Sequence, residues 1–225
     1  MDTAVAYAIM RISVFSSLLP FGVAVSQGRK FDATQRALRT LVVMALLIEL
    51  SAFALNRFLQ LTNLPLLHVY TVVEFALMLF VFQRLGVIGR RAGVVLVALF
   101  TLLAGFAAVY WHSVYEMNVV PRSVESVVVS VLALRYFFQR FYAADLHLQA
   151  PSLGRSPGFW FATGLLLYFP ASLFVFLYGA WFIEMAPLSW AIYAGHALLN
   201  ITKNILFSIA LWVKPQTQVL MTSSP

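Results

Sequence analysis

The chain has 225 residues, of which 62% are hydrophobic and only 10% are charged. Its mean hydropathy of +0.88 lies outside the range of soluble globular domains, so we expect an all-α, polytopic integral membrane protein. The net charge of +7 is spread over short connecting segments, without the basic helix that nucleic-acid binding needs. The composition therefore predicts the lipid bilayer as a partner, and no nucleic acid.

Apolar runs of about 20 residues, the length that crosses a bilayer core of about 30 Å, predict the membrane spans. The sequence contains seven such runs and predicts a seven-transmembrane-helix bundle. Their approximate bounds are 4–24, 38–56, 65–84, 93–112, 119–136, 159–182 and 188–212. We expect a single membrane domain over 1–214 and a short polar tail over 215–225.

Lysine and arginine are distributed unequally between the two sides of the predicted bundle. The connections after the first, third and fifth spans, with the segment after the seventh, hold 11 of the 15 basic residues. Because basic loops resist translocation, we expect the N-terminus outside and the C-terminus in the cytoplasm, in the cell inner (plasma) membrane. These basic loops are also where we expect a cytoplasmic signalling partner to bind.

Known catalytic motifs are missing from the sequence. The chain has no cysteine, which excludes disulfides, thiolate metal sites and cysteine nucleophiles. It also has no Gly-rich phosphate loop, no His-Glu-x-x-His and no Gly-x-Ser-x-Gly. The sequence leaves an enzymatic activity uncertain and leans against one.

Five ionisable residues from five predicted spans fall at a similar depth. With a rise of about 1.5 Å per residue, they lie roughly 9 to 14 Å below the outer surface. An isolated charge at this depth is expensive, so such side chains face the bundle interior and pair with one another. Arg11, Glu49, Glu74, Glu125 and His196 therefore predict one shared polar site in the outer half.

Helical spacing extends this predicted site. Tyr70 and Glu74 are four residues apart and share a helix face, while Arg122 and Glu125 are three apart and can form an ion pair. A purely structural ion pair is the alternative for Arg122 and Glu125. For Glu49 and Glu74, a ligand or proton role and an interhelical hydrogen bond both remain open. The predicted ligand-binding residues are Arg11, Glu49, His68, Tyr70, Glu74, Arg122, Glu125, His196, Asn200 and Lys203.

The last predicted span carries a polar stripe. His196, Asn200 and Lys203 recur at helical spacing, which indicates a face turned toward the bundle interior. A lysine in the seventh span opposite a carboxylate in the third invites comparison with microbial rhodopsins. The third span lacks the Arg-Tyr-x-Asp-Trp pattern of those proteins, so a retinal bound through Lys203 is only a minor alternative.

A divalent metal is a second candidate cofactor. Imidazole and carboxylate are ligands that zinc, iron or manganese accept, and the candidates are Glu49, Glu74, His68 and His196. The four residues lack the short-range spacing that makes metal motifs specific. An apolar ligand beside the aromatic sixth span is the other option for the site, and the sequence leaves the cofactor unknown.

Three segments resemble a known group of proteins. The run from Asn63 through Pro65, His68 and Tyr70 to Phe75 carries most of the likeness. The runs 159–168 and 196–200 add to it. They resemble uncharacterised bacterial seven-transmembrane proteins of Bacteroidetes type, some of them encoded near sensor histidine kinases. Proline at position 170, where that group has a small polar residue, departs from the pattern. The resemblance implies a membrane sensor.

Three classes of function fit these observations. The first is a receptor-like, small-ligand- or ion-binding protein that signals through a cytoplasmic partner, and we favour it. The second is a proton- or ion-coupled transporter, since intramembrane carboxylates are typical of transporters. The third is a metal-dependent intramembrane lipid hydrolase, although such sites use several histidines around an activated water.

Overall fold

The computed structural model describes residues 3–27, 31–111, 113–116, 118–146, 153–183 and 186–214. Over these ranges the protein is all-α and contains no strand, as the sequence predicts. The predicted tail over 215–225 lies outside the described residues. The elements are α1 (Thr3–Ser16), α2 (Leu18–Ser26), α3 (Ala33–Arg57), α4 (Leu64–Arg84), α5 (Arg90–Tyr110), α6 (Val119–Leu146), the 3₁₀ turn η1 (Leu153–Arg155), α7 (Pro157–Ile183) and α8 (Ala186–Trp212).

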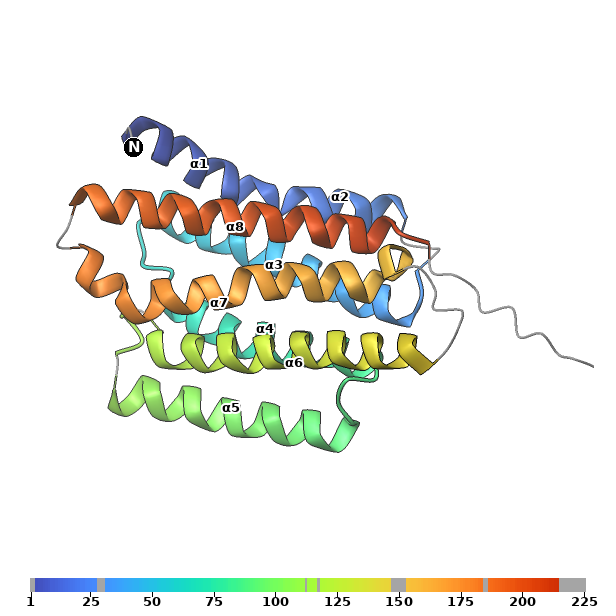
Figure 1. Ribbon diagram of the computed structural model, residues 1–225. Coiled ribbons are helices and arrows are strands. Elements are labelled where there is room, and N and C mark those ends of the chain that lie inside the picture. Colours follow the sequence, from blue (N-terminus) through green and yellow to red (C-terminus); the bar gives the residue numbers. More distant parts are fainter. Residues whose placement is uncertain are drawn as a thin grey trace, which may run out of the picture.

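From α3 to α8, long helices that follow one another in the chain run antiparallel in a single bundle, and α1 and α2 run in the same direction as α8 (Figure 1). Around the bundle, α8 packs against α1, α2 and α7, α6 packs against α7, and α4 packs against α3, α5 and α6. The interior is aliphatic and aromatic, and the rings of Phe75 in α4 and Phe100 in α5 stack at 4.1 Å between centroids. The core therefore joins every long helix to its neighbours in one domain.

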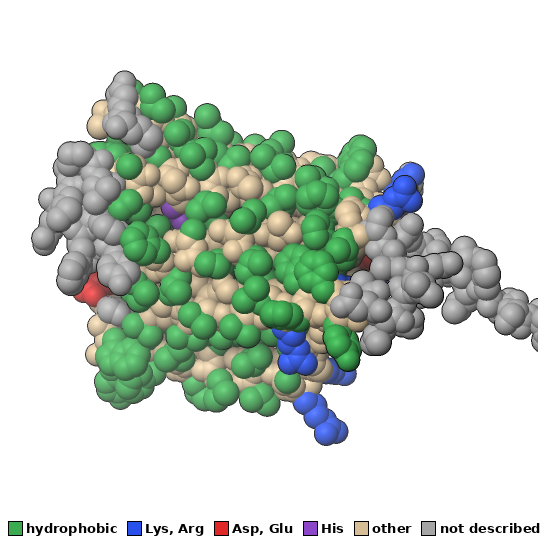
Figure 2. Space-filling model, viewed as in Figure 1, with side chains coloured by type: hydrophobic (Ala, Val, Ile, Leu, Met, Phe, Trp, Pro, Cys, Tyr) green, Lys and Arg blue, Asp and Glu red, His purple; other side chains and the backbone are tan. Residues whose placement is uncertain are grey.

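Five of the segments are long and apolar enough to cross a membrane, by length and composition: Thr3–Ser26, Ala33–Arg57, Leu64–Arg84, Arg90–Tyr110 and Pro157–Val175. The surface agrees with this, because large apolar side chains such as Leu102, Val109 and Phe138 are exposed along the helices. Figure 2 shows apolar side chains covering much of the visible face. The protein is thus a helical membrane protein.

The first apolar run is broken into two helices, where the sequence predicts one. Pro20 has no N–H to donate to the carbonyl of Ser16, so the chain is interrupted at Ser17. The hydroxyls of Ser16 and Ser17 donate to the carbonyls of Ser13 and Val14, at 2.6 and 3.0 Å. Serine side chains thus reinforce the turn that precedes the proline.

α6 is also longer than predicted, since it continues ten residues beyond the expected end at 136. The hydropathy pattern marks only the part that suits a bilayer, whereas the helix goes on with exposed residues such as Gln139 and Arg140. Tyr136, at the predicted end, is buried, and its hydroxyl lies 3.1 Å from the hydroxyl of Ser156, just before α7 begins. The connection between the two helices is correspondingly shorter than the sequence suggests.

The start of α3 is tied to the end of α8 by one glutamine. Asp32 and Gln35 form a capping box, in which the Gln35 N–H donates to Asp32 Oδ1 at 2.7 Å. The Gln35 amide group also donates to the carbonyls of Ala210, Leu211 and Val213 at 2.8 to 3.2 Å. Ala210 and Leu211 belong to the last turn of α8, whose carbonyls have no partner within the helix, and Val213 directly follows it. Gln35 therefore satisfies two helix ends at once.

Candidate functional site

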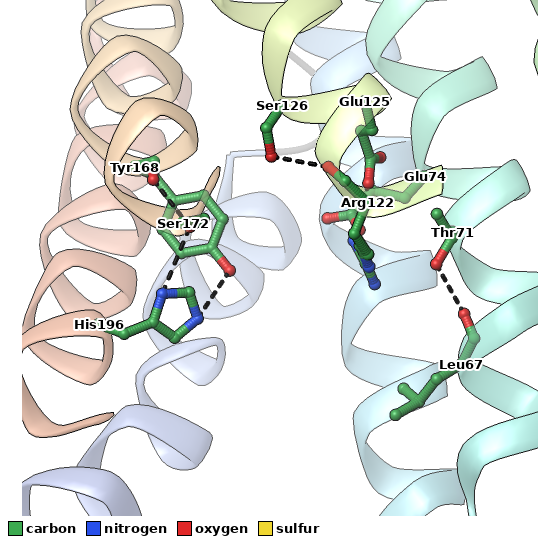
Figure 3. A network of polar contacts seen from close by, with 9 residues as sticks. All are labelled: Leu67, Thr71, Glu74, Arg122, Glu125, Ser126, Tyr168, Ser172 and His196. Carbon is green, nitrogen blue, oxygen red and sulfur yellow. Dashed lines mark hydrogen bonds and ion pairs between the residues drawn. The ribbon is translucent and has the colours of Figure 1, made fainter. Parts of the chain in front are cut away.

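Arg122 in α6 bridges two carboxylates from different positions in the bundle. Its Nη1 donates to Glu74 Oε2 in α4 at 2.6 Å and to Glu125 Oε2, one turn further along α6, at 3.0 Å. The Glu125 side chain is fully buried, while those of Glu74 and Arg122 are 11% and 19% exposed. The predicted pair within α6 is thus part of a three-member cluster that joins α6 to α4 (Figure 3).

Tyr70 adds an aromatic wall to this cluster. It precedes Glu74 by one turn on α4, and the guanidinium carbon of Arg122 lies 5.8 Å from the centroid of its ring. At this distance the ring face attracts the cation. The hydroxyl of Thr71, on the next position of α4, donates to the carbonyl of Leu67 at 2.8 Å (Figure 3).

His196 in α8 contacts two polar side chains of α7. Its Nε2 lies 3.4 Å from the Tyr168 hydroxyl, and its Nδ1 lies 3.3 Å from Ser172 Oγ. The Ser172 hydroxyl donates to the carbonyl of Tyr168 at 2.8 Å, so its own proton is already used. A neutral imidazole that carries its proton on Nδ1 therefore satisfies both contacts. Figure 3 shows these three side chains across from Arg122.

Lys203 lies two turns from His196 on α8 and points at the same tyrosine. Its Nζ is 4.1 Å from the centroid of the Tyr168 ring, a cation–π geometry. Tyr168 thus holds a histidine at its hydroxyl and an ammonium group over its face. Tyr168 and Ser172 are not among the predicted ligand-binding residues, although their spacing of four residues places them on one helix face.

These groups line one cavity of about 1040 Å³ between α1, α3, α4, α6, α7 and α8. All the predicted ligand-binding residues line it except Arg11 and Glu125. Glu125 lies behind Arg122 and reaches the cavity only through that ion pair. Arg11 is exposed on α1 and does not join the polar layer, because the buried face of that helix carries Ala6 and Ser13 instead.

His68 and Asn200 line the cavity but also have structural partners. His68 Nε2 contacts the carbonyl of Glu116 at 3.0 Å and so ties α4 to the 113–116 connection. The Asn200 amide donates to Ser13 Oγ at 3.0 Å. Asn204, one turn on, donates to Ser16 Oγ at 2.7 Å. The polar stripe of α8 is therefore divided between the cavity and a seam with α1.

The four predicted metal ligands do not gather into a metal centre. Among the residues that the structure describes, no group of three or more His, Asp or Glu side chains is placed to hold a metal ion. Glu74 is instead paired with Arg122, and His196 contacts Tyr168 and Ser172. The described part of the chain thus offers a polar, ion-paired cavity to a ligand.

Comparisons with known proteins return nothing for this chain, since no family model, curated protein or solved structure matches it.

Replacing Arg122 by methionine tests the ion-pair cluster. The substitution leaves two buried carboxylates without their cation, which costs about 3–5 kcal/mol of unfolding free energy. We expect a large fall in the melting midpoint of the purified protein, measured by thermal unfolding in lipid nanodiscs. Arg57→Met is the matched control, because Arg57 is exposed at the end of α3, and should change the midpoint little. Equal falls in the melting midpoint for the two substitutions would contradict a stabilising ion-pair cluster at Arg122.

Proposed function

We propose that the chain is a receptor-like, seven-helix protein of the plasma membrane that binds a small amphipathic molecule. In addition to the five apolar segments, α6 and α8 have 28 and 27 residues and lie alongside the others in the bundle. Both exceed the roughly 20 residues that a span requires. They carry Arg122, Glu125 and Lys203, whose charges face the interior cluster and lower the apolar character of these helices.

The distribution of charge supports an orientation with the C-terminus in the cytoplasm. Exposed basic residues gather at the end of the bundle where α4 gives way to α5 (Figure 2). They include Arg84, Arg90, Arg91, Arg135 and Arg140. Such a basic end remains on the cytoplasmic side and faces anionic lipid headgroups. The cavity mouth, which includes Gln60, Asn63 and Glu116, then lies at the outer surface.

The cavity is the observation that carries the ligand-binding proposal. Its volume of about 1040 Å³ lies just above the range of about 300–1,000 Å³ typical of small-molecule sites. Polar side chains line the mouth and the middle layer, and apolar side chains such as Leu41, Met78 and Phe207 line the inner part. A small molecule with a polar head and an apolar body matches this lining.

The link between α3 and α8 supports a signalling role. Glu49 in α3 and Lys203 in α8 both line the cavity, and Gln35 joins the same two helices at the opposite end. A ligand that changes the spacing of α3 and α8 at the cavity therefore acts on the basic end through rigid helices. A cytoplasmic partner bound at that end would receive the signal.

Single cysteines test the proposed topology, because the native chain has none. We expect a membrane-impermeant maleimide to label Ser113→Cys in intact cells, since Ser113 lies in the exposed connection before α6. Arg90→Cys, at the start of α5, should be labelled only after the cells are opened. Labelling of Arg90→Cys in intact cells would contradict the orientation.

Binding of probe amphiphiles tests the proposed function. Octylamine, octanol and octanoate share one apolar chain and differ in the head, and we expect at least one to raise the melting midpoint saturably. Ala45→Phe, which adds an aromatic ring to the cavity wall, should abolish that response while the protein stays folded. A signalling role further predicts reduced hydrogen exchange in the 85–89 connection when the probe binds.

Two results would contradict these expectations. If none of the three probes acts saturably, or if all act equally on wild type and Ala45→Phe, the ligand-binding proposal is wrong. Flux of the bound probe across sealed proteoliposomes, lost in Glu74→Gln, would favour a transporter over a receptor.

A further inference from the structure

The negative and positive charges of the polar middle layer do not balance. Glu49, Glu74 and Glu125 supply three carboxylates, and Arg122 and Lys203 supply two cations. His196 adds no charge in the neutral form that its contacts with Tyr168 and Ser172 favour. With all three carboxyls ionised, the described residues of the layer are short of one positive charge, and uncompensated charge is costly at this depth.

One of the three acidic residues lines the cavity and has a carboxylate oxygen without a hydrogen-bond partner. Glu49 Oε2 is buried and has no hydrogen-bond partner, and Glu49 lines the cavity. Glu125 Oε1 is also buried without a partner, but Glu125 is not part of the wall. A proton bound to the carboxyl group would remove the charge and still leave Glu49 Oε2 without a hydrogen-bond partner. A ligand that donates a hydrogen bond at Glu49 would supply what is missing.

Lys203 does not fill this position. Its Nζ lies over the Tyr168 ring, and within the described ranges it forms no ion pair with a carboxylate at 4.0 Å or less. Its charge acts on Glu49 only from a greater distance. Arg122 is likewise committed, since one of its nitrogens already holds Glu74 and Glu125. Neither charged neighbour therefore forms a close ion pair with Glu49.

The wall beside Glu49 changes from polar to apolar toward the inner end of the cavity. On α3, Val42 lies seven residues before Glu49, which corresponds to about 10 Å along the helix axis. The inner wall includes Leu41, Val42, Met78, Leu165, Phe169 and Phe207. A molecule with its head at Glu49 would thus extend its apolar part along this wall.

We propose that the ligand is an amphipathic amine, whose ammonium group donates to Glu49 and whose apolar part lies against the inner wall. This assignment rests on the proposed ligand-binding function and specifies the chemical class of the ligand. The ammonium supplies both the missing positive charge and the missing donor, in a charge-assisted hydrogen bond. A neutral alcohol supplies only the donor, and a carboxylate increases the excess of negative charge.

The test compares three probes on the full-length protein in phosphatidylcholine nanodiscs. Melting midpoints are measured against the concentration of octylamine, octanol or octanoate, and apparent dissociation constants are derived. We expect octylamine to bind about 10-fold more tightly than octanol, the effect of one charge-assisted hydrogen bond, and octanoate to bind most weakly. Glu49→Gln should remove the preference for octylamine over octanol.

Glu116→Gln is the matched control, because Glu116 lines the mouth of the same cavity and its backbone carbonyl, which contacts His68, is unchanged. This variant should keep the preference for octylamine. If Glu49→Gln does not fold, Glu49→Asp retains the charge and should still bind octylamine more tightly than octanol.

Each contrary outcome has a separate meaning. Octanol or octanoate that binds wild type as tightly as octylamine overturns the amine assignment and leaves the ligand-binding function in place. An unchanged preference for octylamine in Glu49→Gln, or its loss in Glu116→Gln, overturns the role of Glu49. Failure of all three probes contradicts the ligand-binding function itself.

Discussion

A guanidinium group shared between two buried carboxylates is the constraint on which the rest of the site depends. Arg122 contacts Glu74 and Glu125 at 2.6 and 3.0 Å, and Glu125 has no exposure to solvent. Charges inside a membrane protein are tolerated only where they face the protein interior and meet a partner. The cluster therefore fixes the facing sides of α4 and α6, and with them one wall of the cavity.

The opposite wall is set by weaker polar contacts between α1, α7 and α8. Asn200 and Asn204 reach Ser13 and Ser16 in α1, next to the break before α2. Serine and asparagine form interhelical hydrogen bonds and carry no charge that needs a partner. Each such hydrogen bond contributes only a modest free energy of stabilisation. The cavity thus lies between one wall held by ion pairs and another held by hydrogen bonds.

Much of the fold follows from the sequence, because apolar runs of span length can only be helices in a bilayer. The all-α class is confirmed, and five segments have the length and composition of membrane spans. Helix ends are less predictable. The hydropathy of α6 does not show that the helix continues to Leu146, and the apolar run that contains Pro20 does not show the break at Ser17.

For the site, depth along each span identified five ionisable residues, and three of them, Glu49, Glu74 and His196, line the cavity, because ionisable groups in hydrocarbon seek one another. Depth alone does not give the rotation of a helix about its axis. Arg11 has the right depth and is nevertheless exposed, while Tyr168, which contacts both His196 and Lys203, carries no charge to attract notice. The pairing of Glu74 with Arg122 across 48 residues of sequence depends on packing that no local pattern records.

A double-mutant cycle between Arg122 and Glu74 measures the central interaction most directly. The unfolding free energies of wild type, Arg122→Met, Glu74→Gln and the double variant give the coupling between the two side chains. The ion-pair cluster predicts a coupling of at least about 2 kcal/mol, with the double variant more stable than the sum of the single losses implies. Additive effects, within about 0.5 kcal/mol, would show that the two residues do not stabilise the bundle together.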